Sequence, residues 1–150
     1  MNSTILRTAT RVLVPLFLLM SLLILWRGHN APGGGFIGGL MAVIAVALYA
    51  LAEGVAEARR FLRLDALSLA GLGLSMSIAG GLWGAAVGGA FLQGVWPFYG
   101  YVPGEGTSGW PVGSILLFDT GVFVTVLGAV CAILFALEDA VDAEPQEDQR

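Results

Sequence analysis

Two ionisable side chains of this 150-residue chain lie within or beside long apolar runs, where charge is unusual. Asp119 is the only acidic residue inside a run long enough to span a membrane, and His29 is the only histidine. A carboxylate in such a run is costly unless it is paired, so it indicates either ion or proton handling or a structural contact. An imidazole can relay protons near neutral pH or donate a structural hydrogen bond. The sequence leaves both interpretations open for both residues.

No other set of residues predicts catalysis or metal binding. The chain contains no lysine, so it has no phosphate-binding glycine loop with its lysine, and the serines have no positioned base. One histidine and one cysteine, Cys131 in an apolar run, are too few for a metal site or a disulfide framework. We therefore expect no catalytic residue, no bound metal and no cofactor.

The composition indicates which environment positions these residues. Hydrophobic residues make up 57% of the chain and charged residues only 12%, about half the usual share in a soluble domain. This excludes a water-soluble globule, and it excludes disorder, which requires low hydrophobicity and high net charge. A net charge of −4 without lysine also excludes a basic nucleic-acid binder. The chain is predicted to be a membrane protein.

Charge-free runs predict an all-α membrane protein with four transmembrane helices, because about 20 apolar residues cross about 30 Å of hydrocarbon. Residues 1–137 form the predicted four-helix domain, and residues 138–150 form an acidic tail that we interpret as solvated. No small-residue cleavage site follows the first run, so we expect it to stay as a helix. The four predicted helices are Thr8–Trp26, Gly35–Ala52, Asp65–Leu92 and Val112–Leu137.

The arginines predict the orientation of the chain in the membrane. With four spans, six arginines fall on the side of the two termini, and only Arg27 falls on the opposite side. Short cytoplasmic loops gather positive residues, so both termini are predicted to be cytoplasmic. The longer outer loop, residues 94–111, is rich in aromatic residues and proline, which suits the membrane interface or a binding platform.

Glycine supplies the strongest packing signal. Close backbone approach between membrane helices needs small residues, and the third predicted helix has a stripe of Gly80, Gly84 and Gly88. Such stripes serve packing within the chain or packing against other subunits, and their abundance favours a larger complex. In the fourth helix, Gly121 lies about 200° from Asp119 at about 100° per residue. We therefore expect Gly121 and the Asp119 carboxylate on nearly opposite faces of the fourth helix.

The segment from Gly28 to Gly39, GHNAPGGGFIGG, is too unusual for a simple connector. Pro32 fixes its own backbone and restricts Ala31, while the following glycines can adopt conformations closed to other residues. We expect a tight, close-packed start of the second helix. His29 is on the same side of the membrane as Asp119, so the two can approach each other.

His29–Gly39 and Leu117–Phe123 together resemble two motifs of the MrpB/MnhB family, whose members are small subunits of the Mrp-type multisubunit cation/proton antiporter. The resemblance covers about Arg27 to Val130 and leaves the N-terminal stretch and the tail outside. The family's signature falls on two sets of residues. These are His29, Asn30, Pro32, Gly33, Gly34, Gly35, Phe36, Gly38 and Gly39, and then Phe118, Asp119, Gly121 and Val122.

The resemblance implies a multi-pass subunit in the cell membrane, whose partners are the other subunits of the complex and the lipid bilayer. The complex would exchange cytoplasmic Na⁺, or another monovalent cation, for H⁺, with the pumping lysines and glutamates in the large antiporter-like subunits. This chain would be an accessory subunit, needed for assembly and for shaping part of the ion pathway. Three alternatives stay open: a subunit of a membrane-bound hydrogenase-type complex, an autonomous homo-oligomeric channel or carrier, and a structural spacer.

Overall fold

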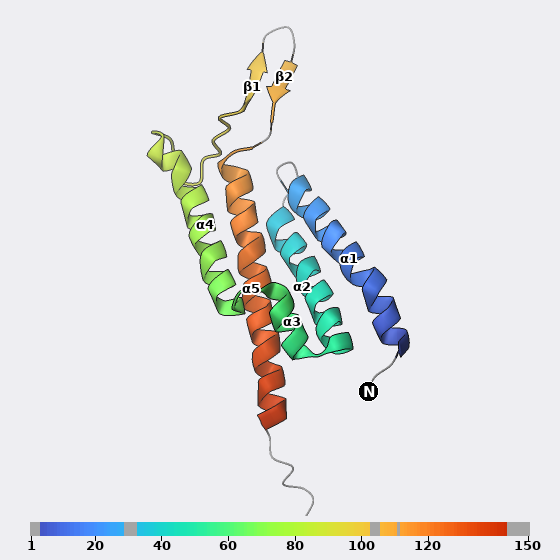
Figure 1. Ribbon diagram of the computed structural model, residues 1–150. Helices are drawn as coiled ribbons and strands as arrows, with labels where there is room; N and C mark the ends of the chain where they lie inside the picture. Colours follow the sequence, from blue (N-terminus) through green and yellow to red (C-terminus); the bar gives the residue numbers. More distant parts are fainter. Residues whose placement is uncertain (1–3, 29–32, 103–105, 111, 144–150) are drawn as a thin grey trace, which may run out of the picture.

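The computed structural model describes residues 4–28, 33–102, 106–110 and 112–143. Four segments are long and apolar enough to cross a membrane, so the predicted four-span helical fold is confirmed. The third of them joins a short helix to a long one. In chain order the elements are α1 (Thr4–Arg27), α2 (Gly34–Glu53), α3 (Val55–Leu62), α4 (Ala66–Ala86), β1 (Tyr99–Val102), β2 (Gly106–Gly109) and α5 (Ser114–Ala143) (Figure 1).

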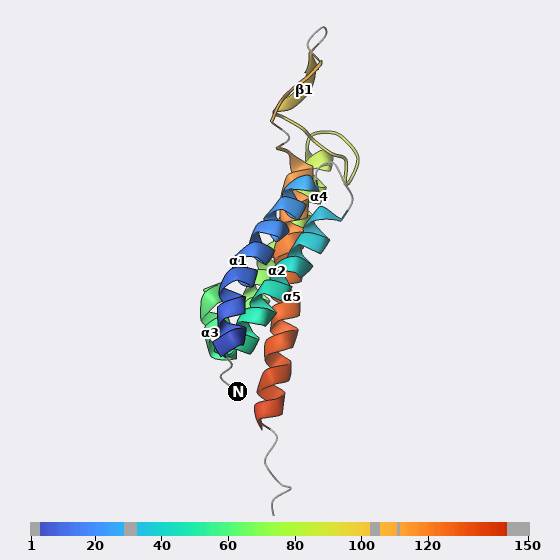
Figure 2. The ribbon, with the colours of Figure 1, turned by 90° about the vertical axis from the view of Figure 1, so that its right-hand side faces the viewer.

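The long helices form a single row in the order α4, α5, α2, α1 (Figure 1). Viewed along the row, they overlap one another, so the assembly is one helix thick (Figure 2). We call the end of the row nearest β1 and β2, where α2 and α5 begin, the hairpin end. The opposite end, where α1 begins and α5 finishes, is the tail end. A single row leaves both broad sides of most helices uncovered by the chain itself.

Small residues bring α4 and α5 into close contact. A Cβ atom on Gly80 would lie 2.8 Å from the backbone nitrogen of Phe118, and one on Gly73 would overlap the backbone of Thr125. In return, a Cβ atom on Gly121 would overlap the backbone of Ser77. Glycines of each helix thus receive the backbone of the other, as expected where helices associate in lipid.

Similar contacts join α2 to its neighbours. The Ser21 hydroxyl of α1 donates a buried hydrogen bond of 2.8 Å to the carbonyl of Gly38 in α2. A Cβ atom on Gly39 would lie 2.9 Å from the carbonyl oxygen of Phe123 in α5. Backbone contacts through glycine therefore join all three pairs of neighbouring helices.

The predicted end of the third span at Leu92 is wrong, because α4 ends at Ala86. Gly88 has a φ of 87° and Leu92 a φ of 62°, so the chain reverses and the Leu92 N–H donates to the carbonyl of Gly81 at 3.0 Å. Gly88 is therefore outside the helix, and a Cβ atom there would have open space around it. Of the predicted stripe, Gly80 packs on α5, and Gly84 packs on the carbonyls of Ala90 and Gln93.

Three features of the structure were not expected from the sequence: the greater length of α5, the helix α3 and the pair of strands β1 and β2. The chain continues as helix for six residues beyond Leu137, to Ala143, and the loop after α2 contains α3. The loop before α5 contains the antiparallel pair β1 and β2, with Tyr99 opposite Gly109. The short helix α3 buries Ala58 in a cluster with Val46 of α2 and Cys131 of α5, so it covers part of one side of the row at the tail end.

Ion pairs secure the tail end. The Arg59 guanidinium of α3 lies 2.6 Å from the Asp139 carboxylate, donates to the carbonyl of Phe135 at 3.3 Å, and stacks 5.0 Å from the centre of the Phe135 ring. Arg7 of α1 pairs with Glu53 of α2 at 3.1 Å. These side chains are half-exposed, so such pairs contribute little each.

Candidate functional site

Asp119 lies in the second turn of α5, near the hairpin end, and its side chain is half-buried. Its carboxylate is directed at the backbone N–H of Gly35, in the first turn of α2. The Oδ2 atom occupies the space that a Cβ atom on Gly28 would fill, directly after the end of α1. One carboxylate thus contacts the backbone where α1 ends and α2 begins.

Three glycines make this approach possible. A Cβ atom on Gly35 would overlap the backbone of Asp119, and one on Gly34 would overlap the backbone of Gly28. Gly34 and Gly35 are buried. The sequence pattern did not single out Gly28 as a site residue, although it directly precedes the signature segment. We call Asp119, Gly28, Gly34 and Gly35 the Asp119 junction.

The face of α5 opposite the Asp119 junction packs on α4. Gly121 lies against Ser77, whose hydroxyl donates to the carbonyls of Gly73 at 3.1 Å and Phe118 at 3.4 Å. Asp119 and Gly121 therefore serve different neighbours, as the helical spacing predicted. One face of α5 holds α4, and the other holds α2 and the end of α1.

The remaining signature residues named here fall into four groups. His29, Asn30 and Pro32 lie outside the described residues, so a contact between His29 and Asp119 stays a prediction. Gly38 and Gly39 are buried between helices. Phe36 and Phe118 are 53% and 36% exposed. Gly33 precedes α2 with a φ of 86°, a conformation that favours glycine.

Polar groups that could hold a cation are scarce in the part of the chain that the structure describes. Within those ranges no three His, Cys, Asp or Glu side chains gather as a metal site would require. Asp119 already directs a carboxylate oxygen at a backbone N–H. The junction is thus a close backbone contact among helices, and among its four residues Asp119 carries the one charge.

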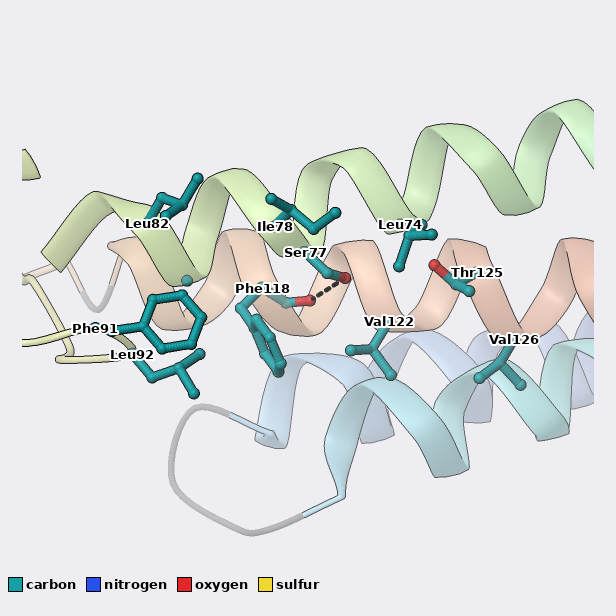
Figure 3. Close-up of a pocket in the computed structure, with 11 residues that line it drawn as sticks. Leu74, Ser77, Ile78, Leu82, Phe91, Leu92, Phe118, Val122, Thr125 and Val126 are labelled. Carbon is teal, nitrogen blue, oxygen red and sulfur yellow. Dashed lines mark hydrogen bonds between the residues drawn. The ribbon is translucent and has the colours of Figure 1, made fainter. Parts of the chain in front are cut away.

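A cavity of about 650 Å³ lies between α4 and α5 near the hairpin end (Figure 3). Leu74, Ile78 and Leu82 of α4 face Phe118 and Val122 of α5 across it, and Phe91 and Leu92 close one end (Figure 3). The hydroxyl of Thr125, at its other end, donates to the carbonyl of Gly121 at 2.8 Å. The lining is therefore apolar and supplies no ligand set for an ion.

Comparisons with known proteins agree with this architecture. Residues 5–132 match a family model described as a domain related to the MnhB subunit of Na⁺/H⁺ antiporter. A Na⁺/H⁺ antiporter subunit of Bacillus subtilis is 32% identical over 133 residues, covering 89% of this chain and 91% of that protein. The subunit of the same name from Alkalihalophilus pseudofirmus is 31% identical over 138 residues, covering 92% and 94%.

A solved structure, that of the Mrp complex from Dietzia sp. DQ12-45-1b, matches with a TM-score of 0.71 and 35% identity. The match covers 94% of this chain and 15% of the matched chain of that complex. The chain thus spans nearly the whole length of the curated relatives and a small part of a much longer polypeptide in the solved complex.

Proposed function

The chain belongs to the MnhB family and is a multi-pass membrane subunit of a multisubunit Na⁺/H⁺ antiporter, and we propose that it is an accessory subunit of this complex. In this role it is needed for assembly and shapes part of the ion pathway, and it performs no catalysis of its own. The transported ions are Na⁺ and H⁺, moved by the complex as a whole.

The observation that carries this proposal is the single row of helices. A row one helix thick encloses no path across a membrane, because a path needs polar groups around a shared space. Its helices expose large apolar side chains, such as Leu23 at 60%, Leu74 at 53% and Ile133 at 62% exposure. Helices of other subunits can pack on such surfaces and complete a pathway that this chain lines on one side.

The solved complex supports a large neighbour. Since the match takes up 15% of the matched polypeptide, the rest of that polypeptide is covalently joined to an MnhB-like segment. We infer that a long subunit, corresponding to the rest of that polypeptide, lies beside this chain in its own complex. The curated relatives are antiporter subunits, which favours this host over the hydrogenase-type complex.

The test is reconstitution of proteoliposomes with and without this subunit. We expect the complete complex to move protons in response to Na⁺, the complex lacking this chain to be poorly recovered and inactive, and the chain alone to move neither ion. Na⁺-dependent proton movement by the chain alone would support the autonomous carrier. Full activity of the complex without the chain would contradict the accessory role.

A further inference from the structure

The first turn of α2 has no cap from its own side chains. The first N–H groups of a helix have no partner within it, and buried N–H groups must find one elsewhere. Here the first helical hydrogen bond runs from the N–H of Ile37 to the carbonyl of Gly33, at 2.9 Å. Gly33 stands at the capping position and supplies no side chain. The N–H groups of Gly34 and Gly35, both buried, therefore precede the helical ladder.

Asp119 of α5 supplies the acceptor oxygen that Gly33, which has no side chain, cannot supply. Its carboxylate is directed at the N–H of Gly35, which is the second residue of α2, and the backbone of Asp119 lies directly against Gly35. A capping side chain within a helix accepts from the second or third N–H, so the contact reproduces a normal cap with an acceptor from another helix. The positive end of the helix dipole also favours a carboxylate at this point.

We propose that Asp119 is the N-terminal cap of α2, supplied by α5, and is thereby the positioning residue that fixes α2 and the end of α1 against α5. The glycines at positions 28, 34 and 35 are required because the backbone atoms and the carboxylate fill the spaces where Cβ atoms would lie. The role requires an acceptor oxygen at position 119, and it requires neither a negative charge nor binding of the transported ion.

Hydrogen exchange in the purified complex tests the cap directly. Asp119→Asn keeps an acceptor oxygen, Asp119→Ala removes it, and Asp139→Ala makes the same change on the same helix at the tail end. We expect exchange at the amides of residues 34–36 to rise about fivefold or more in Asp119→Ala and to stay near wild type in the other two variants. Unchanged exchange in Asp119→Ala would overturn the proposal.

If Asp119→Ala fails to assemble, the amount of intact complex recovered for each variant tests the cap. Loss of the Asp119→Ala complex, with good recovery of Asp119→Asn and Asp139→Ala, supports the cap, because only the acceptor distinguishes the variants at position 119. Poor recovery of Asp119→Asn would overturn it, since an amide oxygen can take the same hydrogen bond.

A transport measurement separates a cap from an ion-handling group, and it alone rests on the proposed function. For intact Asp119→Asn complex we expect a rate within about twofold of wild type, with the same pH profile and the same apparent KM for Na⁺. Loss of transport, a displaced pH profile or a raised KM at full assembly would place the carboxylate on the transport path. If the wild-type complex moves no protons with Na⁺, the proposed function fails, while the exchange experiment still decides the cap.

Discussion

The hairpin end and the tail end of the row each hold helices together around charge, by different means. At the hairpin end, one carboxylate of α5 meets the backbone directly after α1 and in the first turn of α2, and glycines 28, 34 and 35 make room for this approach. At the tail end, Arg59 joins α3 to α5 through the Asp139 carboxylate, the carbonyl of Phe135 and the ring of Phe135. The ring is buried, whereas the Arg59 and Asp139 side chains are 45% and 66% exposed.

The difference lies in how each contact responds to change. Backbone contacts through glycine leave no free volume, so an added methyl group must move a helix. Exposed ion pairs are flexible and screened by salt, so losing one partner costs little. We therefore expect substitutions at the hairpin end to be severe and those at the tail end to be mild.

The largest expected contrast concerns which side of the membrane each end faces. In a Cys131→Ala background, we expect Glu105→Cys, between β1 and β2, to react with an impermeant thiol reagent added outside the cell, and Arg60→Cys of α3 to stay unlabelled. The arginine distribution predicts this all-or-none pattern. After the membrane is permeabilised, position 60 must react, since the Arg60 side chain is 76% exposed. The reverse labelling would invert the topology.

The next contrast pairs two glycines of helices. Gly35→Ala places a methyl group on the backbone of Asp119, whereas Gly71→Ala on α4 meets open space. Overpacking costs about 1–3 kcal/mol, so we expect recovery of intact complex to fall about tenfold for Gly35→Ala and to stay unchanged for Gly71→Ala. Size-exclusion chromatography of the solubilised complex measures both. An equal loss at Gly71 would mean that another subunit packs on that side of α4.

A smaller effect is expected where α4 meets its own returning loop. A side chain on Gly84 would displace the carbonyls of Ala90 and Gln93, whereas Leu82 is half-exposed and loses little when truncated. We expect Gly84→Leu to lower recovery of the complex more than Leu82→Ala does. Normal assembly of both variants would show that the loop can move aside without cost.

The smallest effects belong to the tail end. Arg59→Ala removes an ion pair, a carbonyl hydrogen bond and a cation–π contact, together worth about 1 kcal/mol at a half-exposed site. Arg60→Ala removes only the pair with Glu57 and should cost about 0.5 kcal/mol or less. Thermal unfolding of the complex should rank the two in this order, with both differences reduced in about 1 M salt. A larger loss for Arg59→Ala than for Gly35→Ala would reverse the comparison of the two ends.

The four spans could be predicted because lipid imposes a simple requirement on length and polarity. The opposite faces of Asp119 and Gly121 also followed from the helical repeat alone. The end of α4 could not be predicted, because the apolar run continues to Leu92 while the backbone reverses at Gly88. Hydropathy does not distinguish an apolar helix from an apolar loop folded back on it.

The contact partners of Asp119 were not predictable for a different reason. Periodicity gives the face of α5 on which a side chain lies, but it does not say which helix occupies that face. The approach of the carboxylate to the N–H of Gly35 depends on α2 lying between α1 and α5, with its first turn level with the second turn of α5. One signal was available in the sequence: Gly33 at a helix start leaves that helix without a capping side chain, so an acceptor from elsewhere was to be expected.

The order of helices in the row also sets the order of events during synthesis. The ribosome completes α1 and α2 early, but their neighbour α5 is made last, after α4 and the long loop. Until α5 emerges, no helix packs on Gly35 and Gly39 of α2, and the first turn of α2 lacks its contact with Asp119. Two separately inserted helical hairpins must therefore diffuse together in the bilayer, and a nascent chain that stops before residue 114 presents an open α2 to the cell's quality-control proteases.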